Sequence, residues 1–353
     1  MLAQPDHPEA IAPAWLEAML APAFPGVAVQ RVHVETSSEG TNANALLRVD
    51  YKNAVRAPGN LFVKLPPTEP RQRALVLGSG MGQREVFFYR DLAPQVPLRI
   101  PAVYGTAIEE SDGRFAILIE DLLSSGCSFP DGESGVGLAL AERAIDDLAA
   151  LHCAQYNEDS LARVPTLLRD PAYAARMLEH ALATKSHELD PALAAIAKIY
   201  IEHGDAVHDL WEAGALVLTH SDGHLANLFV EKGRLGFLDW GCMAKAPAMR
   251  DVGYFLCMAL SIEDRRRHER DLIRRYLAQR ERYRKPAGLD FEAAWEAHRL
   301  QSTYTVVAAA PAVLNPREPG DPGGVYAGHF AARASAAVGD LDAEALLRAH
   351  LGL

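Results

Sequence analysis

Two patterns of apolar and polar residues follow one another along the chain. In the first third, short apolar runs, some alternating with polar residues, predict β-strands. An amphipathic stretch at 8–21 predicts a helix before these strands, and 83–94 predicts a helix between them that ends before Pro94. The last two predicted strands would pair as a hairpin. The five predicted strands are 27–36, 43–54, 60–66, 102–109 and 114–122.

Helical periodicity dominates from about residue 134 onward. In 139–156, for example, the apolar residues recur on one face of a helix, and only 216–240 again has a strand-like pattern. This predicts an α+β fold with two lobes. The first, at 1–121, is small, β-rich and carries one key helix after the short N-terminal one, and the second, at 122–353, is larger and mainly helical.

Composition and charge place the chain among globular proteins. Its 353 residues, 49% apolar and 23% charged, can bury the core of two lobes. The net charge of −11 argues against nucleic acid as a partner, because that surface needs a basic stripe. The four cysteines lack C-x-x-C spacing, and the sequence shows neither a signal-peptide pattern nor an apolar window of about 20 residues. We therefore expect a cytoplasmic protein without a membrane partner. The oligomeric state is not readable from the sequence.

The segment LTHSDGHLANLFV places His220, Asp222, His224 and Asn227 between two apolar runs. One interpretation is an ordinary loop whose Asp and Asn make local turn hydrogen bonds. A second is a metallohydrolase site, with His220, Asp222 and His224 on one side of an extended strand. A third is the catalytic loop of phosphoryl transfer. Its H-x-D-x-x-x-x-N spacing supplies a carboxylate for a hydroxyl proton and an amide oxygen for magnesium.

The residues after this segment favour the third interpretation. A predicted hairpin follows Asn227 and ends in Leu-Asp-Trp-Gly, which brings a second carboxylate, Asp239, back toward the end of the first strand. Magnesium ions on a nucleoside triphosphate need oxygen ligands such as Asn227 and Asp239. The kinase pattern has Asp-Phe-Gly at this position, and this chain has Trp240 in place of the phenylalanine.

A nucleotide clamp is expected in the first third of the chain. Lys64 lies on an apolar strand, where a lysine needs an anionic partner, and Glu85 lies on the predicted helix that follows. An ion pair between them would aim the ammonium at the α- and β-phosphates. The alternative is a surface lysine and a solvated glutamate.

Two further segments are candidates for nucleotide contacts. The small polar segment between the first two strands offers Ser38, Gly40 and Thr41 to phosphate oxygens, although a plain hairpin turn fits this segment nearly as well. Adenine could hydrogen-bond to the backbone of Glu120 and Leu122, where the chain passes between the lobes.

Together these segments resemble the small-molecule kinases of the aminoglycoside-phosphotransferase and choline-kinase type, which are relatives of the protein kinases. The chain is most similar to the ecdysteroid-kinase-like branch. The resemblance implies a bilobal protein-kinase-like fold, ATP and Mg²⁺ as cofactors, and a small-molecule hydroxyl as the acceptor. The segments that carry it are EVFFYRDLAP, PAVYG, LIEDL, LAALHCAQY, LTHSDGHLANLFV, FLDWG and APAMRDVGYFL.

The resemblance also implies roles for individual residues. Asp222 would be the catalytic base, Asn227 and Asp239 would bind magnesium, and Lys64 with Glu85 would position the phosphates. Two further residues would support the site: His220 would brace the loop, and Asp251, which heads an apolar helix, would act as a buried cap or internal acceptor.

The acceptor itself is not readable from the sequence. Trp295, Arg299 and Tyr304 could face the acceptor cavity, although helix packing with a solvated arginine explains them better. The Pro/Gly-rich stretch 315–324 is either a helix connector or a lid. A catalytically silent pseudokinase remains the main alternative function, and the metallohydrolase is the other.

Overall fold

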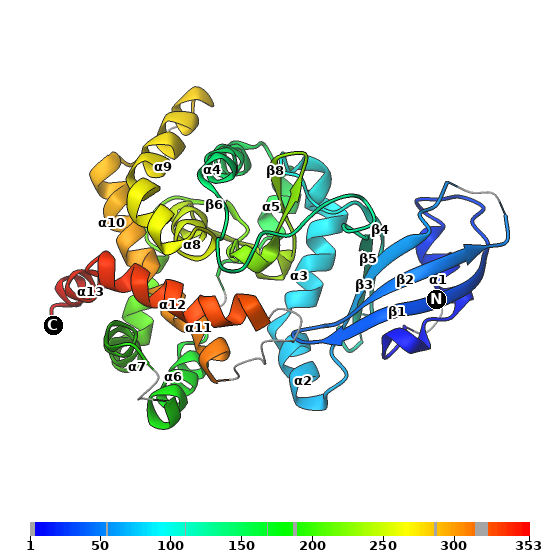
Figure 1. The fold of residues 1–353 in the computed structure, drawn as a ribbon, viewed down its shortest axis with the longest axis horizontal. Coiled ribbons are helices and arrows are strands. Elements are labelled where there is room, and N and C mark those ends of the chain that lie inside the picture. The colour runs from blue at the N-terminus through cyan, green and yellow to red at the C-terminus, as the bar shows by residue number, and fades with distance from the viewer. Residues whose placement is uncertain are drawn as a thin grey trace. The chain divides into compact units, whose positions relative to one another are not determined.

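The protein consists of two compact units in the computed structural model shown in Figure 1. The first unit comprises 1–128 with 238–242, and the second comprises 129–237 with 243–353. The lobe boundary predicted at 121/122 stays a prediction, and the stretch 315–324 lies almost entirely outside the described residues. The structure describes residues 4–53, 56–109, 111–167, 169–185, 189–285, 288–314 and 324–353.

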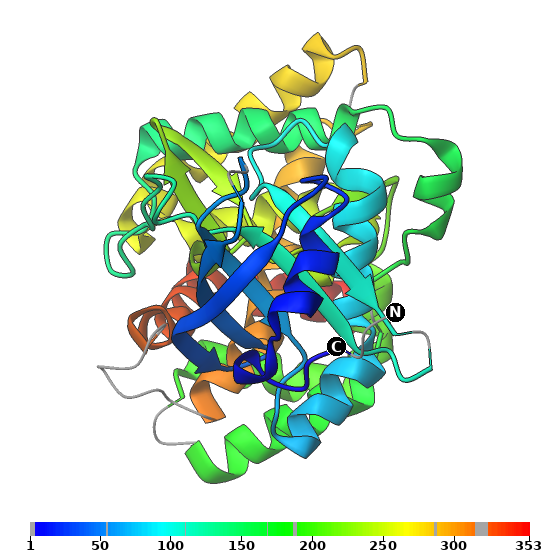
Figure 2. The same ribbon diagram turned by 90° about the vertical axis from the view of Figure 1, so that its right-hand side faces the viewer.

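An antiparallel five-stranded sheet forms the centre of the first unit, with strand order β1-β2-β3-β5-β4. Figure 2 shows α1 running across one face of this sheet. The strands are β1 (Val29–Glu39), β2 (Ala43–Tyr51), β3 (Asn60–Leu65), β4 (Val103–Ile108) and β5 (Phe115–Glu120). The helical segments are η1 (Pro8–Ala10), α1 (Pro13–Leu20), α2 (Pro70–Ser79), α3 (Met81–Phe87), the π-helical η2 (Phe88–Leu92), η3 (Ala93–Gln95) and η5 (Trp240–Cys242).

Strand alternation sorts the side chains of β3 onto the two faces of the sheet. Leu61, Val63 and Leu65 are fully buried in the core beneath α1. Lys64 lies between them in sequence, so its side chain leaves the sheet on the opposite face, on which α3 packs. That packing requires a glycine, because a Cβ on Gly82 of α3 would lie 2.0 Å from the ring of Phe115 in β5.

The predicted helices of this unit are only partly correct. The helix expected at 83–94 begins earlier, at Met81, and continues through η2 and η3 to Gln95. Helix α2 was not predicted, because it has one buried side chain, Val76, and therefore no apolar stripe. Strand β1 runs past Thr36 to Glu39, because backbone pairing with β2 continues where the side chains are polar.

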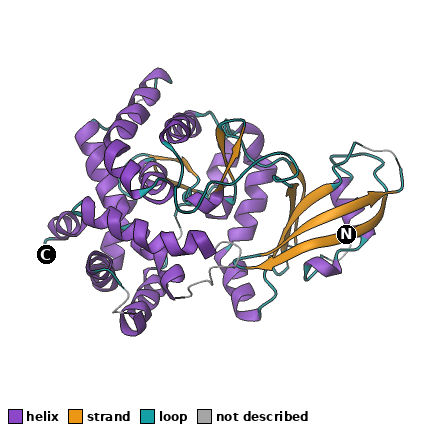
Figure 3. Cartoon of the chain, in the orientation of Figure 1, coloured by secondary structure: helices purple, strands orange, loops and turns teal. Residues whose placement is uncertain are grey.

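Helices dominate the second unit, as the purple ribbon in Figure 3 shows. Its strands form two separate antiparallel pairs, β6 with β9 and β7 with β8. These are β6 (Leu216–Thr219), β7 (Leu228–Glu231), β8 (Arg234–Phe237) and β9 (Ala244–Pro247). The helices are α4 (Leu138–Cys153), α5 (Glu158–Arg163), α6 (Pro171–Lys185), α7 (Pro191–Trp211), η4 (Leu225–Asn227), α8 (Met249–Ala259), α9 (Ile262–Arg282), α10 (Phe291–Ser302), α11 (Tyr304–Leu314), α12 (Gly324–Asp340) and α13 (Ala343–Leu351).

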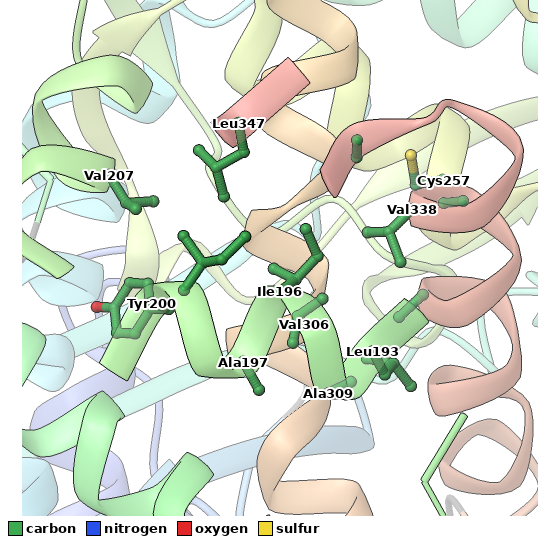
Figure 4. Close-up of a cluster of buried hydrophobic side chains, with 14 of the residues drawn as sticks. Leu193, Ile196, Ala197, Tyr200, Val207, Cys257, Val306, Ala309, Val338 and Leu347 are labelled. Atoms are coloured by element: carbon green, nitrogen blue, oxygen red, sulfur yellow. The ribbon is translucent and has the colours of Figure 1, made fainter. Parts of the chain in front are cut away.

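Helix α7 has an apolar face that packs against other helices of this unit. Leu193, Ile196, Ala197 and Tyr200 follow the i, i+3, i+4, i+7 spacing, so they form one apolar face. Figure 4 shows this face turned toward apolar side chains of α11, α12 and α13. The α+β class with a β-rich N-terminal sheet and a helical remainder is therefore confirmed. Among the described helices, none combines the length and the apolar character needed to cross a membrane.

Candidate functional site

A buried lysine between two carboxylates forms one part of the candidate site, in the first unit. Lys64 Nζ lies 2.6 Å from Glu85 Oε2 and 2.9 Å from Asp239 Oδ1. Lys64 and Glu85 are buried, whereas 32% of the Asp239 side chain is exposed. Three residues that are far apart in the sequence thus form one ionic cluster, and Asp239 is the member that a ligand can reach.

Burial and charge act in opposite directions on this cluster. Burial lowers the pKa of Lys64, but the charges of Asp239 and Glu85 outweigh it and raise the pKa overall, so the amine stays protonated. Burial raises the pKa of Glu85 to about 7, with Lys64 opposing this shift and Asp239 adding to it. Glu85 therefore titrates near neutral pH.

Helix α3 and the helical turn after it also hold the segment 239–241. The Trp240 ring is fully buried and stacks on Phe88, with the ring centroids 3.9 Å apart and the planes 6° from parallel. Arg84 Nε donates a hydrogen bond to the carbonyl oxygen of Gly241 at 2.8 Å. Tryptophan thus takes the position of the aromatic residue in the kinase pattern and packs there without exposure.

The segment proposed for phosphate contacts is a tight hairpin turn. Ser38 belongs to β1 and pairs with Asn44, so the turn is limited to 40–42. The backbone N–H of Gly40 donates to Asn42 O at 3.1 Å, which closes the turn. The plain hairpin therefore describes the backbone here, and the phosphate contacts of Ser38, Gly40 and Thr41 stay a prediction.

The backbone near the end of β5 offers one hydrogen-bond donor for a base. The N–H of Glu120 is already used, because it donates to Ala102 O at 2.8 Å, and the Leu122 carbonyl accepts from Cys127 at 2.9 Å. Within the described part of the chain, the N–H of Leu122 donates no hydrogen bond. The Glu120 side chain is a structural acceptor for Arg99, with contacts of 2.9 and 3.0 Å.

The polar turn after β6 lies in the second unit and is held by a buried carboxylate. Asp251 accepts hydrogen bonds from the backbone N–H of His220 at 2.8 Å and of Ser221 at 2.6 Å. Its third partner is His152 Nε2 at 3.2 Å. Burial alone would raise the pKa of Asp251, but these contacts hold it below its usual value. Asp251 is thus an internal acceptor and does not cap α8, whose N-cap is Ala248.

This support lets the turn adopt an unfavourable backbone conformation. Ser221 has a φ of 66°, in the left-handed region that non-glycine residues rarely occupy. Asp222 follows, and its Oδ2 accepts a hydrogen bond from Asn227 Nδ2 at 3.0 Å. Asn227 Nδ2 also contacts Asp222 O at 3.0 Å and His224 Nε2 at 3.2 Å. The side chains of the predicted catalytic loop are therefore brought together.

The arrangement does not support the metallohydrolase interpretation. Nδ1 of His220 accepts a hydrogen bond from the Asp222 N–H at 3.2 Å, so this nitrogen is engaged within the turn itself. His224 Nε2 and Asp222 Oδ2 are 3.6 Å apart. Across the described ranges, no three His, Cys, Asp or Glu side chains form a group that could hold a metal ion.

The residues considered for the acceptor side fall into two places. Tyr304 packs with its ring centroid 5.4 Å from that of Tyr254, which lies 6.3 Å from the His224 ring. Trp295 and Arg299 instead line a cavity beside the first residues of β6. Arg299 Nε donates to the Leu341 carbonyl oxygen at 2.6 Å while 22% of its side chain stays exposed, so its role on the acceptor side stays a prediction.

Comparison with known proteins identifies the family. The sequence profile of the phosphotransferase enzyme family matches residues 45–298, well over half of the chain. The chain belongs to the phosphotransferase enzyme family. This confirms the predicted superfamily, whereas the ecdysteroid-kinase-like branch stays a prediction. No curated protein matches the chain in sequence.

Solved structures share the fold of this phosphotransferase family at low identity. A provisionally named aminoglycoside phosphotransferase from Ralstonia eutropha JMP134 is 18% identical with a TM-score of 0.53, covering 94% of this chain and 97% of that one. A choline/ethanolamine kinase family protein from Mesorhizobium loti is 15% identical with a TM-score of 0.51, covering 90% and 92%. The GDP and kanamycin complex of APH(2")-IIIa is 14% identical with a TM-score of 0.50, covering 94% and 98%.

Two supporting residues of the site were missed by the sequence analysis. His152 contacts Asp251, and its other ring nitrogen lies 2.8 Å from the hydroxyl of Tyr276. His152 interrupts the apolar face of its helix, and a buried polar residue at such a position needs a partner, which was a usable signal. Tyr276 gives no such signal, because it lies on another helix 124 residues away.

Proposed function

We propose that the chain is an ATP-dependent kinase that transfers the γ-phosphoryl group to a hydroxyl of a small molecule, with Mg²⁺ and with Asp222 as the catalytic base. Membership of the phosphotransferase family supports the reaction class. The observation that carries the proposal is the bond of 3.0 Å between Asp222 and Asn227, in a turn anchored by Asp251. A fixed carboxylate beside an amide is the pair that phosphoryl transfer needs.

The first unit would bind the nucleotide. Lys64, oriented by Glu85, would contact the α- and β-phosphates, and Ser38, Gly40 and Thr41 would cover them. Adenine would accept a hydrogen bond from Leu122, whose N–H has no partner in the described chain, next to Glu120. The GDP complex of a protein with the same fold agrees with nucleotide binding.

The donor chemistry of two residues fits Mg²⁺. The side-chain hydrogen bonds of Asn227 use Nδ2, which leaves the amide oxygen Oδ1 for a hard cation. Asp239 supplies a partly exposed carboxylate. In this proposal Asn227 and Asp239 hold the ion, which when bound neutralises charge on the triphosphate.

The protein's own groups would then carry out an in-line transfer. Asp222 orients the acceptor hydroxyl and takes its proton, while Lys64 and backbone N–H groups stabilise the charge of the transferring group. His220 braces the turn. The acceptor is proposed to be a small-molecule alcohol, and the protein is proposed to act in the cytoplasm.

Two substitutions test the assignment. Asp222→Asn should keep magnesium-ATP binding and lose turnover, whereas Asp239→Ala should lose magnesium-dependent binding as well. Binding is measured by thermal unfolding, since ligand at 100 times its Kd stabilises the folded state by about 2.7 kcal/mol. Turnover is measured as ATP consumption with a panel of alcohols. Full turnover in Asp222→Asn would refute the catalytic role, and nucleotide binding by the wild type without turnover on any alcohol would favour the pseudokinase.

A further inference from the structure

The cavity lined by Trp295 and Arg299 lies within the second unit and has a volume of about 930 Å³. It borders the start of β6 and the end of β9, whereas the catalytic turn leaves the opposite end of β6. The end of α7 and helices α9 and α10 supply most of the other lining residues. Apolar side chains of this wall include Leu210, Val217, Met249 and Leu300.

A buried positive charge lies beside these apolar side chains. Arg280 of α9 is 8% exposed and forms no ion pair with any residue that the structure describes. Its Nε donates to Lys285 O at 2.9 Å and its Nη1 to the Tyr276 hydroxyl at 3.0 Å. A guanidinium has five N–H groups, so three remain for another acceptor. A buried charge without a counter-charge is costly, which makes an anionic ligand favourable here.

The other charged side chains of the cavity are engaged or lie at its rim. Asp290 caps α10 by accepting from the N–H of Ala293 at 2.9 Å. Glu296 is exposed and accepts from His350 at 3.0 Å, and Glu292 is exposed. The buried charge that the cavity leaves unmatched is therefore positive.

Tyr276 connects this wall with the catalytic turn through a chain of hydrogen bonds, in which each group donates to the next from Arg280 to Asp251. Arginine can only donate, so the Tyr276 oxygen accepts from Arg280 and its hydrogen is available to His152 Nδ1, 2.8 Å away. His152 then carries its proton on Nε2 and donates to Asp251 at 3.2 Å. Asp251 in turn accepts the N–H of His220, the first residue of the turn.

We propose that this cavity is a second ligand site, which binds a small molecule with a carboxylate or phosphate group and an apolar body. The anionic group pairs with Arg280 and the apolar body lies against the aliphatic wall. An anion held by the three remaining N–H groups draws the guanidinium toward it and weakens the bond from Arg280 to Tyr276, so occupancy is relayed through Tyr276 and His152 to Asp251. Ligand binding in this cavity does not depend on the proposed kinase activity. Only an effect of the ligand on turnover would rest on the proposed function.

Titration calorimetry on the full chain tests the binding site. Octanoate and octyl phosphate serve as the anionic probes and separate the two head groups, and octyltrimethylammonium is the cationic control. We expect at least one anion to bind and the cation not to bind. Arg280→Gln should weaken binding by about tenfold or more, the equivalent of one charged hydrogen bond, and Arg280→Lys should retain most of it.

A second variant keeps the test decisive if Arg280→Gln does not fold. Ala293 lines the cavity at an exposed position, so Ala293→Trp should place a large ring in the cavity and weaken binding without disturbing the core. Failure of both anions to bind at millimolar concentration, or binding that neither substitution weakens, would overturn the second site.

The relay has a readout that does not depend on catalysis. In protein labelled with ¹⁵N-histidine, octanoate or octyl phosphate should shift the ring nitrogen signals of His152. Tyr276→Phe should still bind the anion but lose this shift, because the hydroxyl between Arg280 and His152 is gone. An equal shift in Tyr276→Phe would refute the relay. A shift in a chain that turns over no alcohol would refute the kinase proposal alone.

Discussion

Replacing Asp251 by asparagine tests how the catalytic turn is held. The buried carboxylate accepts from His220 N–H, Ser221 N–H and His152 Nε2 at 2.8, 2.6 and 3.2 Å. Asparagine has one oxygen and one NH₂ group, so at least one of these donors would face another donor. A lost bond to a charged acceptor and an unsatisfied buried donor each cost about 1–3 kcal/mol, so we expect a loss of about 3 kcal/mol.

Thermal unfolding and turnover measure this effect. At about 2–4 °C per kcal/mol for a domain of this size class, Asp251→Asn should lower Tm by about 6–12 °C. Turnover should fall as well, because Ser221 would lose a bond that holds its left-handed backbone. Asp209→Asn, at an exposed position on α7, is the matched control and should change Tm far less, because its ion pair with Arg169 is solvent-exposed.

The pH dependence of the Asp251 effect has a defined sign. The pKa of Asp251 is lowered on folding, so its contribution to stability is present above the unfolded value of about 4 and is lost as the pH falls through the folded pKa. The difference in unfolding free energy between wild type and Asp251→Asn should therefore shrink in acid. An unchanged Tm and turnover at neutral pH would refute the anchoring role.

Two further substitutions probe the first unit. Gly82→Ala should lower the free energy of unfolding by about 1–3 kcal/mol, because the added carbon would overlap the Phe115 ring. Gly78→Ala is the control and should be neutral or slightly stabilising, because open space surrounds that position. Equal effects of the two substitutions in a denaturant titration would contradict the packing argument. Folding raises the pKa of Glu85 to about 7, so its contribution to stability is full below about pH 4 and is lost as the pH rises through 7. As the pH rises from 5 to 8, the free energy of unfolding of Glu85→Gln should therefore increase relative to that of the wild type. If ionised Glu85 orients Lys64, nucleotide affinity should increase as the pH rises through 7 in the wild type but not in Glu85→Gln.

Most of the helices and strands could be predicted from local sequence patterns. The strands were predictable because they are short apolar runs, alternating in β2 and continuous in β5, and the hairpin β4–β5 because its turn is polar. Helix α2 has no apolar stripe, and the extension of β1 depends on backbone pairing, so neither has a signal in the side chains. The catalytic turn does have a signal in its side chains, because Asp222 and Asn227 are close in sequence as well as in space.

The contacts that support the site depend on packing between distant segments. Spacing cannot show that Asp239 approaches Lys64, or that Asp251 serves the backbone of the turn in place of capping its own helix. The same holds for Tyr276, which meets His152 only because α9 packs on α4. Resemblance gave Lys64, Asp239 and Asp251 as site residues, but all three contacts were found only in the structure.

The discontinuity of the first unit has a consequence for synthesis on the ribosome. Its last segment, 238–242, leaves the ribosome only after the whole of 129–237 has been made. Until then Lys64 of β3 and Glu85 of α3 lack Asp239, and Phe88 lacks the indole that stacks on it. The unit therefore stays incomplete until 238–242 has emerged, and a fragment that ends at residue 128 would lack the ring that stacks on Phe88.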